Sequence, residues 1–419
     1  MLTVKSAAAV LVALGALLVG CDNNDAVEPV ASRSCSELLY AGGDKPDVIV
    51  VSDFPRRGVG ADFTKLMVDA IEFVFRQRHF RAGDYEVGYQ SCNDTLGDEP
   101  YDEHLCRRNA RAYVANADVV GVIGPWNSGC AEVQIPIVSR KAAGPLAMIS
   151  PANTYIALTV ASAGARRFYP DGIRSYVRVV THDNAQGSAA AHVASKLRAR
   201  RVALVHQDFK DAYARELTRG FLHSARGLGL EVRQFKWEPR KSYRALAHSV
   251  AAFRPQAVYL AGETQVNAKR LVLDLRATLG SGVTLIGPDS FAFPEIGREL
   301  GPAGEGMRLT VPGIPPQALP AAGKRFVREF GASLIEPGVQ GAPEAAQAAE
   351  VLLDAIARSD GTRASIVKEL FATRVTDGIL GSFSFDRNGD IVPRPVGVYR
   401  LDHGKIVTEG VVRVSLGGL

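Results

Sequence analysis

Two kinds of apolar pattern alternate along the first part of the chain. Residues 48–52 (VIVVS) are almost continuously apolar, as in a strand buried on both faces, whereas residues 64–78 repeat apolar side chains at helical spacing. Strands that alternate with helices predict a parallel sheet with right-handed crossovers. The strands expected in this block are 48–52, 85–90, 118–124 and 145–150, and the expected helices are 64–78, 104–115 and 131–142.

The same alternation restarts after Arg174. The second block has its own run of apolar strands, so the sequence predicts two α/β lobes of similar size. Its expected strands are 175–180, 201–206, 231–237, 257–262 and 283–289, and its expected helices are 185–198, 212–229, 242–253 and 268–280. Later helices, which should pack back onto the first lobe, are expected at 321–332, 343–359 and 363–372. Asn388-Gly389, between two extended segments, predicts a hairpin turn.

Composition and charge exclude few functions. The 419 residues include 49 Lys and Arg against 44 Asp and Glu, which gives a net charge of +5. Because the basic residues are interleaved with acidic ones rather than gathered in one stretch, the sequence argues against nucleic-acid binding. The length suits about two domains.

The N-terminus has the layout of a secretory signal. A single lysine precedes the apolar run 7–20, which is short for a transmembrane helix. The run ends in LVGC, which resembles the lipobox of bacterial lipoproteins and implies a signal peptide over 1–20 and lipidation of Cys21. Residues 21–46 are then expected to form a lipid anchor and a tether. The alternative is a plain signal peptide with a chance cysteine.

Four cysteines remain after Cys21. An even number of cysteines in an exported protein favours disulfides, and four of them allow three pairings. Their spacing lacks the CxxC pairs of a zinc or redox site, so no metal is expected. The candidate disulfide cysteines are Cys35, Cys92, Cys106 and Cys130.

Motifs for catalysis or cofactor binding are incomplete. Gly58-Val59-Gly60 lacks the third glycine of a dinucleotide-binding loop, because position 63 is Phe. Ser128 lacks the GxSxG frame of a hydrolase nucleophile, and no HExxH spacing occurs. The sequence therefore predicts a binding protein rather than an enzyme, with no cofactor.

Two predicted strand-to-helix turns carry small polar side chains. Residues 124–128 (GPWNS) and 150–154 (SPANT) each follow an apolar strand. Ligands of open α/β sheets bind at the carboxyl ends of the strands, where the next helix offers unpaired amides and the positive end of its dipole. These turns therefore suit an anion. The alternative is that Ser128 and Thr154 are ordinary helix N-caps.

Several stretches together resemble one protein family. In chain order they are VVGVIGPWNSGCAEVQIPIV, GPLAMISPANTYIALT, RVALVHQD with Tyr213 behind it, TLIGPDSF and FSFDRNGD. Over residues 47–414 the chain thus resembles the substrate-binding proteins of branched-chain amino acid ABC transporters. The resemblance implies the type I periplasmic-binding-protein fold, in which two Rossmann-like lobes with parallel sheets are joined by a three-segment hinge. The implied lobes are 47–180 with 313–383 and 181–312 with 384–419, and the hinge would pass near Thr181, Pro312 and Phe383.

The resemblance implies that the first lobe holds the charged headgroup of an amino acid. Ser128 matches the serine that binds the ligand carboxylate, and Thr154 matches the threonine that contacts both charged ends. Ala152 matches a position whose backbone carbonyl accepts a hydrogen bond from the ammonium group. The candidate ligand-binding residues of this lobe are Trp126, Asn127, Ser128, Ala152, Asn153 and Thr154.

Three candidates come from the second lobe. Tyr213 matches a tyrosine that closes over the ligand, and Asp289 matches the acidic counter-ion of the ligand's ammonium group. The alternative for Asp289 is an N-cap of a helix over 293–300. Glu263 stands where the family has an aromatic residue. Its carboxylate could bind a second cation or a polar ligand tail. The alternative is that Glu263 is only exposed to solvent and has no part in binding.

The family also suggests a disulfide pairing. Its members often join a cysteine at the position of Cys92 to one near residue 127, where the nearest cysteine here is Cys130. The resemblance therefore implies Cys92–Cys130 and leaves Cys35 to pair with Cys106, with Cys92–Cys106 as the alternative.

The resemblance as a whole implies a lipoprotein on the outer face of the plasma membrane. We expect it to capture an amino acid or a related small zwitterion or carboxylate between its lobes and to deliver it to the permease of an ABC importer. The expected partners are thus the ligand and the permease, with no nucleic acid and no membrane contact besides the lipid anchor. The alternative is an envelope lipoprotein that uses the same fold for ligand sensing or protein binding.

Overall fold

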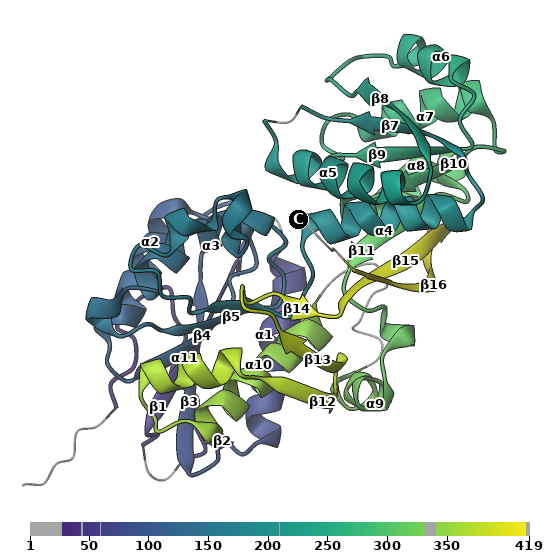
Figure 1. Cartoon of the computed structure of the whole chain (residues 1–419). Coiled ribbons are helices and arrows are strands. Elements are labelled where there is room, and N and C mark those ends of the chain that lie inside the picture. Colours follow the sequence, from purple (N-terminus) through teal and green to yellow (C-terminus); the bar gives the residue numbers. More distant parts are fainter. Residues whose placement is uncertain (1–26, 43–44, 59, 209, 332–340, 416–419) are drawn as a thin grey trace, which may run out of the picture.

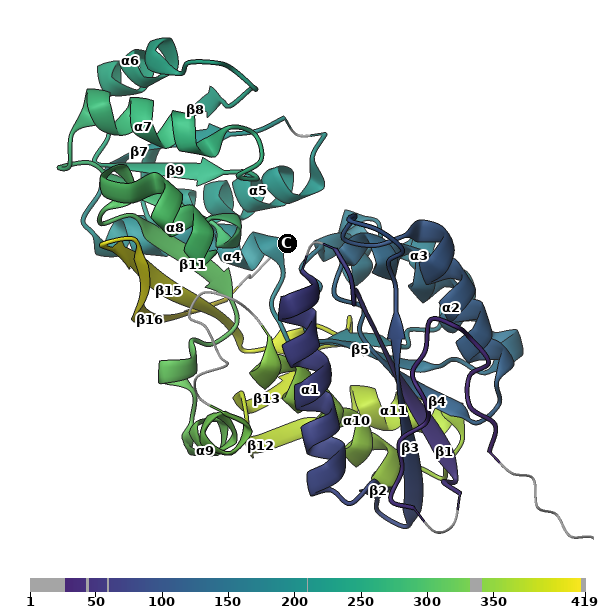
Figure 2. The same ribbon diagram turned by 180° about the vertical axis from the view of Figure 1, so that it is seen from behind.

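The computed structural model describes residues 27–42, 45–58, 60–208, 210–331 and 341–415 and contains two α/β lobes (Figures 1 and 2). We call the lobe built on the first sheet lobe 1 and the lobe built on the second sheet lobe 2. This arrangement confirms the predicted fold class. The expected signal peptide and Cys21 lie outside the described residues. Within the described ranges, no helix has both the length and the apolar content needed to cross a membrane.

Lobe 1 is built on a six-stranded sheet in the order β2-β3-β1-β4-β5-β6. All its pairings are parallel except the short β2–β3 pair. Its strands are β1 (Val48–Phe54), β2 (Arg81–Ala82), β3 (Tyr85–Asn93), β4 (Val119–Ile123), β5 (Ala147–Ser150) and β6 (Tyr176–Arg178). Its helices are α1 (Ala61–Gln77), α2 (Glu103–Ala115), α3 (Ser128–Val138), α9 (Ala321–Phe330), α10 (Ala342–Arg358) and α11 (Arg363–Phe371).

Helices cover both faces of the lobe 1 sheet, which explains why β1 is apolar at consecutive positions. Val48 and Val50 pack with α1, α10 and α11 on one face, whereas Ile49 and Val51 pack with α2 and α3 on the other. Successive side chains of a strand point to opposite faces, so a strand covered on both sides has no position that faces solvent. The late helices α9, α10 and α11 thus join the core of lobe 1, as the sequence predicted.

Lobe 2 is built on a seven-stranded sheet in the order β16-β15-β11-β10-β9-β7-β8. Its strands are β7 (Arg201–His206), β8 (Glu231–Lys236), β9 (Ala257–Ala261), β10 (Thr284–Gly287), β11 (Arg308–Pro312), β15 (Arg394–Asp402) and β16 (Lys405–Val414). Its helices are α4 (Asp183–Lys196), α5 (Ala212–Gly227), α6 (Arg244–Ala252), α7 (Ala268–Leu279) and α8 (Pro294–Leu300). The antiparallel hairpin β15–β16, which the sequence reading did not include, lies against β11 at one edge of this otherwise parallel sheet.

A small sheet of β12 (Arg374–Gly378), β13 (Gly381–Phe385) and β14 (Ile391–Val392) lies between the lobes in Figure 1. The expected turn at Asn388-Gly389 joins β13 to β14, and Gly389 has a φ of +95°. Phe385 and Ile391 pack into the core of lobe 1. The third connection between the lobes therefore follows β14, later in the chain than the expected position near Phe383.

Part of the expected tether belongs to the folded protein. Val27 and Val30 are buried in the core beside α2 and α3. The backbone amide of Leu39 donates to the carbonyl of Tyr89, so this segment runs antiparallel along β3. Apolar residues within a polar segment explain the difference, because Val27 and Val30 gain more by burial than by exposure.

The disulfide pairing differs from the one implied by the family resemblance. Cys35 is bonded to Cys92, and Cys106 is bonded to Cys130. The expected Cys92–Cys130 pair, its partner pair Cys35–Cys106 and the alternative Cys92–Cys106 are therefore all wrong. The reason is the packing: Cys35 forms an antiparallel bridge directly opposite Cys92, and Cys106 on α2 faces Cys130 on the neighbouring helix α3.

Two glycines let α4 and α5 pack with their backbones in contact. A Cβ added at Gly187 would overlap the carbonyl of Leu217, and one added at Gly220 would overlap the carbonyl of Asn184. Neither neighbour can move aside, because both atoms belong to helical backbone. We expect Gly187→Ala or Gly220→Ala to lower the free energy of unfolding by about 1–3 kcal/mol, the usual cost of overpacking. Urea unfolding measures this loss, and Gly227→Ala, where a Cβ meets no atom within 4 Å, is the matched control.

Candidate functional site

A cleft of about 710 Å³ lies between the lobes and is lined by residues of both. This volume is typical of sites for small molecules, which span about 300–1,000 Å³. A smaller cavity of about 310 Å³ lies among α9, α10 and β12 and contains none of the candidate residues. The candidates that line the cleft are Trp126, Asn127, Ser128, Ala152, Thr154, Tyr213, Glu263 and Asp289.

The turn before α3 presents a hydroxyl group to the cleft. The Asn127 side chain is the N-cap of this helix and accepts a hydrogen bond of 2.7 Å from the Gly129 amide. Ser128 is the first helical residue, and its Oγ accepts only a long hydrogen bond of 3.4 Å from the Tyr155 amide. Since the capping role belongs to Asn127, the Ser128 hydroxyl lies at the positive end of the helix dipole and lines the cleft.

Asn153 differs from the other candidates because it is buried and does not line the cleft. Its Nδ2 donates to the Trp126 carbonyl at 2.8 Å, and its Oδ1 accepts from the Tyr176 hydroxyl at 2.9 Å. Both ends of the amide are thus used inside the protein. Asn153 fixes the two lobe 1 turns to each other.

Trp126 provides an aromatic wall on lobe 1. Its ring meets Phe63 of α1 edge-on, with 6.2 Å between the ring centroids. Aromatic pairs in this arrangement hold each other in place. The wall is therefore rigid on the side of the cleft that also holds Ser128.

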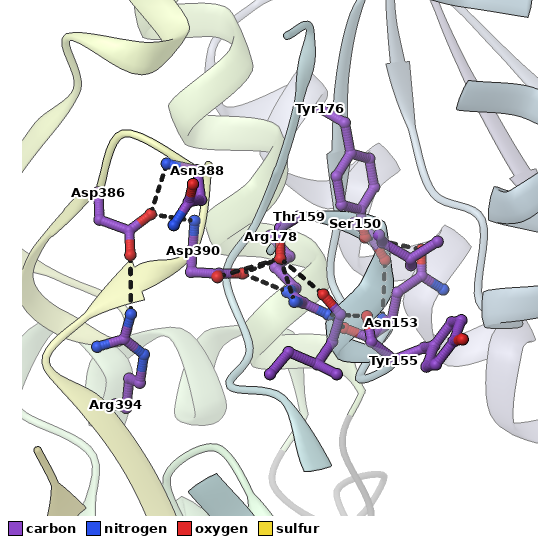
Figure 3. Close-up of polar contacts among 12 residues, drawn as sticks. Ser150, Asn153, Tyr155, Thr159, Tyr176, Arg178, Asp386, Asn388, Asp390 and Arg394 are labelled. Carbon is purple, nitrogen blue, oxygen red and sulfur yellow. Dashed lines mark hydrogen bonds and ion pairs between the residues drawn. The ribbon is translucent and has the colours of Figure 1, made fainter. Parts of the chain in front are cut away.

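A buried ion pair supports the loop that follows β5 (Figure 3). Arg178 of β6 is fully buried, and its Nε donates to Asp390 at 2.7 Å. Its Nη1 also donates to the carbonyls of Asn153 at 3.1 Å and Tyr155 at 2.9 Å, while its Nη2 donates to Thr159 at 2.6 Å. One guanidinium group therefore fixes both flanks of Thr154.

On lobe 2, Asp289 is held from two directions. Its Oδ1 accepts hydrogen bonds from the Tyr213 hydroxyl and, at 2.6 Å, from Gln186 Nε2. Burial raises the pKa of Asp289 above its ordinary value, although these hydrogen bonds act in the opposite direction. Asp289 does not cap α8, because that helix begins at Pro294 after the N-cap residue Phe293. The alternative role considered from the sequence is therefore wrong.

Glu263 lies beside Asp289 in the cleft and is half-buried. Its backbone is held in place by Gln207, which donates to the Glu263 carbonyl at 2.7 Å and accepts from the Glu263 amide at 2.9 Å. Burial, followed by the charges of Asp289 and Asp211, raises the pKa of Glu263 to about 7. The charged neighbours that act on Glu263 are thus themselves acidic.

Asp183 is a cleft residue that the sequence reading missed. It is only 2% exposed, yet it lines the cleft, and its Oδ1 has no hydrogen-bond partner among the described residues. Burial and the charge of Asp289 raise its pKa well above the ordinary value, against a hydrogen bond from the Thr154 side chain. Its position as the first residue of α4, just after an interlobe connection, was the available signal.

Two groups of potential metal ligands lie close together among the described residues, and neither involves the cleft. Asp94 lies beside Cys106 and Cys130, whose sulfurs are joined in a disulfide. Glu305 lies beside Asp402 and His403 at the β15–β16 turn.

Comparisons with known proteins agree with this fold. Residues 54–405 match a family described as periplasmic binding protein. A leucine-binding protein of Thermotoga maritima is 23% identical, with a TM-score of 0.69 over 87% of this chain and 99% of that chain. A branched-chain amino acid transporter binding protein of Streptococcus pneumoniae, solved with isoleucine, is 18% identical, with a TM-score of 0.67 over 88% and 99%.

A solute-binding protein of R. palustris, solved with benzoate, is 17% identical, with a TM-score of 0.64 over 89% of this chain and 98% of that chain. Comparison with curated protein sequences finds no significant match. The family match covers most of the chain, and it is a family of extracytoplasmic solute-binding proteins rather than of enzymes. The chain therefore belongs to the periplasmic binding protein family.

Proposed function

We propose that this protein is a lipoprotein, anchored through Cys21, that captures an amino acid and delivers it to an ABC importer. One observation carries the proposal: candidate residues from both lobes line a single cleft, with Ser128 at a helix N-terminus on lobe 1 and Asp289 on lobe 2. A hydroxyl at a positive helix end suits a carboxylate, and a half-buried aspartate suits an ammonium group. These are the two charged ends of an α-amino acid.

Capture follows from the division of the site between the lobes. Ser128 and Thr154 belong to lobe 1, whereas Tyr213 and Asp289 belong to lobe 2. An amino acid that bridges them makes its full set of contacts only when the lobes are closed, so binding favours the closed form. A permease that recognises the closed form would then receive loaded protein in preference to empty protein.

Asp289→Asn tests the ammonium site. We expect the variant to bind an α-amino acid about 10- to 100-fold more weakly, because a hydrogen bond to a charged group contributes about 1.5–3 kcal/mol. Isothermal titration calorimetry of the full chain in detergent, against neutral, acidic and basic amino acids, gives the affinities. Glu299→Gln on α8, which is exposed and outside the cleft, is the matched control.

A second comparison needs no variant. Each amino acid that binds is compared with the carboxylic acid that lacks only its α-amino group. We expect this acid to bind about 10- to 100-fold more weakly than the amino acid, as expected for Asp289→Asn. Equal affinity for the two would contradict the role of Asp289. If no amino acid binds at all, the proposed capture function is wrong, and a role in sensing or protein binding takes its place.

A further inference from the structure

The charged side chains that line the cleft are all acidic. The lining includes no Lys, Arg or His among the residues that the structure describes. Of the acidic residues, Glu132 is neutralised by Arg167 at 2.8 Å, and the others form no ion pair within the described ranges. Lobe 1 contributes Asp98, Glu99 and Glu132, and lobe 2 contributes Asp183, Asp211, Glu263 and Asp289.

Two arginines that contact residues around the cleft are paired with acidic residues outside its lining. Arg178 is paired with Asp390 and bonded to three further oxygens behind the loop of Thr154. Arg215 donates to Glu216 at 2.8 Å and also interacts with Tyr155 of the lining. Neither guanidinium group belongs to the cleft lining in the described part of the chain, and the acidic partners of both lie outside that lining.

The acidic groups of lobe 2 need more than one cation. Asp183 and Asp289 interact through their charges, and Asp183 Oδ1 is buried without a hydrogen-bond partner among the described residues. A single ammonium group between these two carboxyl groups would satisfy both. Glu263 lies on a different turn, after β9, and no hydrogen bond or ion pair joins its carboxyl group to the described part of the chain. Closure of the lobes would remove the half-buried Glu263 carboxyl group from water, where a carboxylate without a partner is costly, so a cation at Glu263 would stabilise the closed form.

One metal ion does not meet this need. The ligand atoms of three acidic cleft residues nowhere lie within 4.8 Å of one another in the described ranges, as chelation of a single ion would require. The carboxyl groups are spread along the cleft instead. Spread negative charge suits an elongated molecule with separated positive groups.

We propose that the ligand carries two positive groups: an ammonium group held by Asp289 and Asp183, and a second ammonium or guanidinium group held by Glu263. The proposal rests on the proposed function, since it keeps the amino acid headgroup and adds the chemistry of the side chain. The ligand class is therefore an α-amino acid with a cationic side chain. Asp98 and Glu99, exposed at the rim, add an attraction that speeds the approach of such a molecule.

Three compounds of matched length test the proposal by calorimetry on the full chain in detergent. Lysine carries both positive groups and the carboxylate, norleucine lacks the side-chain ammonium group, and cadaverine lacks the carboxylate. We expect lysine to bind at least 10-fold more tightly than norleucine. Equal affinities for lysine and norleucine would overturn this proposal and leave the proposed amino acid capture intact.

The remaining outcomes separate the two proposals. If cadaverine binds as tightly as lysine, the second cation stands and the assigned carboxylate site at Ser128 fails. If neither lysine nor norleucine nor cadaverine binds, this proposal fails, and amino acid capture fails with it only if every other amino acid of the wider panel also fails to bind. Arginine in the same panel distinguishes a guanidinium from an ammonium group at Glu263.

Glu263→Gln locates the second cation. The variant keeps the shape of the side chain and removes its charge, so the preference for lysine over norleucine should fall at least 10-fold. The exposed control Glu299→Gln should keep the wild-type preference. A preference that survives Glu263→Gln in a folded protein, as judged by an unchanged melting temperature, would overturn the assignment of Glu263.

Discussion

Replacing Arg178 with methionine should lower the free energy of unfolding by about 3–5 kcal/mol, because it leaves the carboxylate of Asp390 buried without its partner. Both side chains are almost completely buried, at 0% and 2% exposure. Urea unfolding followed by circular dichroism measures the loss. Arg298→Met removes an ion pair that is exposed on both sides and should cost less than about 1 kcal/mol, which makes it the matched control.

A second variant separates the charge from the packing. Arg178→Met combined with Asp390→Leu removes both charges at once and should recover part of the lost stability, since apolar replacements of a buried pair are often neutral. Recovery remains incomplete, because the carbonyls of Asn153 and Tyr155 lose their donor. If Arg178→Met alone lowers the free energy of unfolding by less than about 1 kcal/mol, the buried ion pair does not have the stabilising role assigned to it.

The same pair predicts a dependence on pH. Burial, the largest single influence, raises the pKa of Asp390, but the charge of Arg178 acts with the charge of His182 and the hydrogen bonds from Arg178 and Thr159 to hold the pKa below its ordinary value of 3.8. A carboxyl group with a lowered pKa stabilises the folded state above that ordinary value and loses this contribution as the pH falls through the folded-state pKa. In Arg178→Met burial is no longer opposed by the arginine charge, so Asp390 takes up its proton at a higher pH than in wild type, and the difference in stability between the two proteins should shrink as the pH falls from 7 toward the ordinary pKa of 3.8.

Loss of a disulfide is the second large effect that we expect. The Cys35–Cys92 bond joins residues 57 positions apart, and chain entropy assigns it about 4 kcal/mol. The Cys106–Cys130 bond spans 24 positions, which corresponds to about 3 kcal/mol. Replacement of both cysteines of one bond by serine, followed by urea unfolding, measures each contribution, and the two double variants serve as controls for each other.

Peptide mapping without reduction tests the pairing itself. A proteolytic fragment that joins Cys35 to Cys92, together with one that joins Cys106 to Cys130, is the expected result. A fragment that joins Cys92 to Cys130 would contradict the structure and restore the pairing implied by the family resemblance.

Much of the fold could be predicted because apolar spacing is local information. The strand at 48–52 and the helix at 64–78 carry their own periodicity, and in the structure the strand ends two residues later and the helix spans Ala61–Gln77. The β15–β16 hairpin was harder to predict. β15 is buried at five consecutive positions but contains Pro395, whereas β16 alternates exposed with half-exposed positions and contains Gly410, so neither strand has the pattern of buried and exposed positions that predicts a hairpin.

Fewer features of the candidate site than of the fold could be predicted from the sequence. Ser128 and Asp289 follow strands in recognisable turns, so their position at the carboxyl edges of the two sheets could be predicted. Asp183 was harder to predict: its position just after an interlobe connection was a signal, but its burial in the cleft depends on how α4 starts there. The cysteine pairing likewise depends on which segments become neighbours in space, which spacing along the chain does not reveal.

The chain crosses between the lobes three times, after β6, β11 and β14, and this route has a consequence for biosynthesis. The core of lobe 1 contains α10, and the sheet of lobe 2 contains β15 and β16 from the C-terminal end. An N-terminal portion leaving the ribosome therefore lacks parts of both cores. Neither lobe can complete its core until nearly the whole polypeptide has been made, so we expect a partly synthesised chain to leave apolar surface of both lobes uncovered.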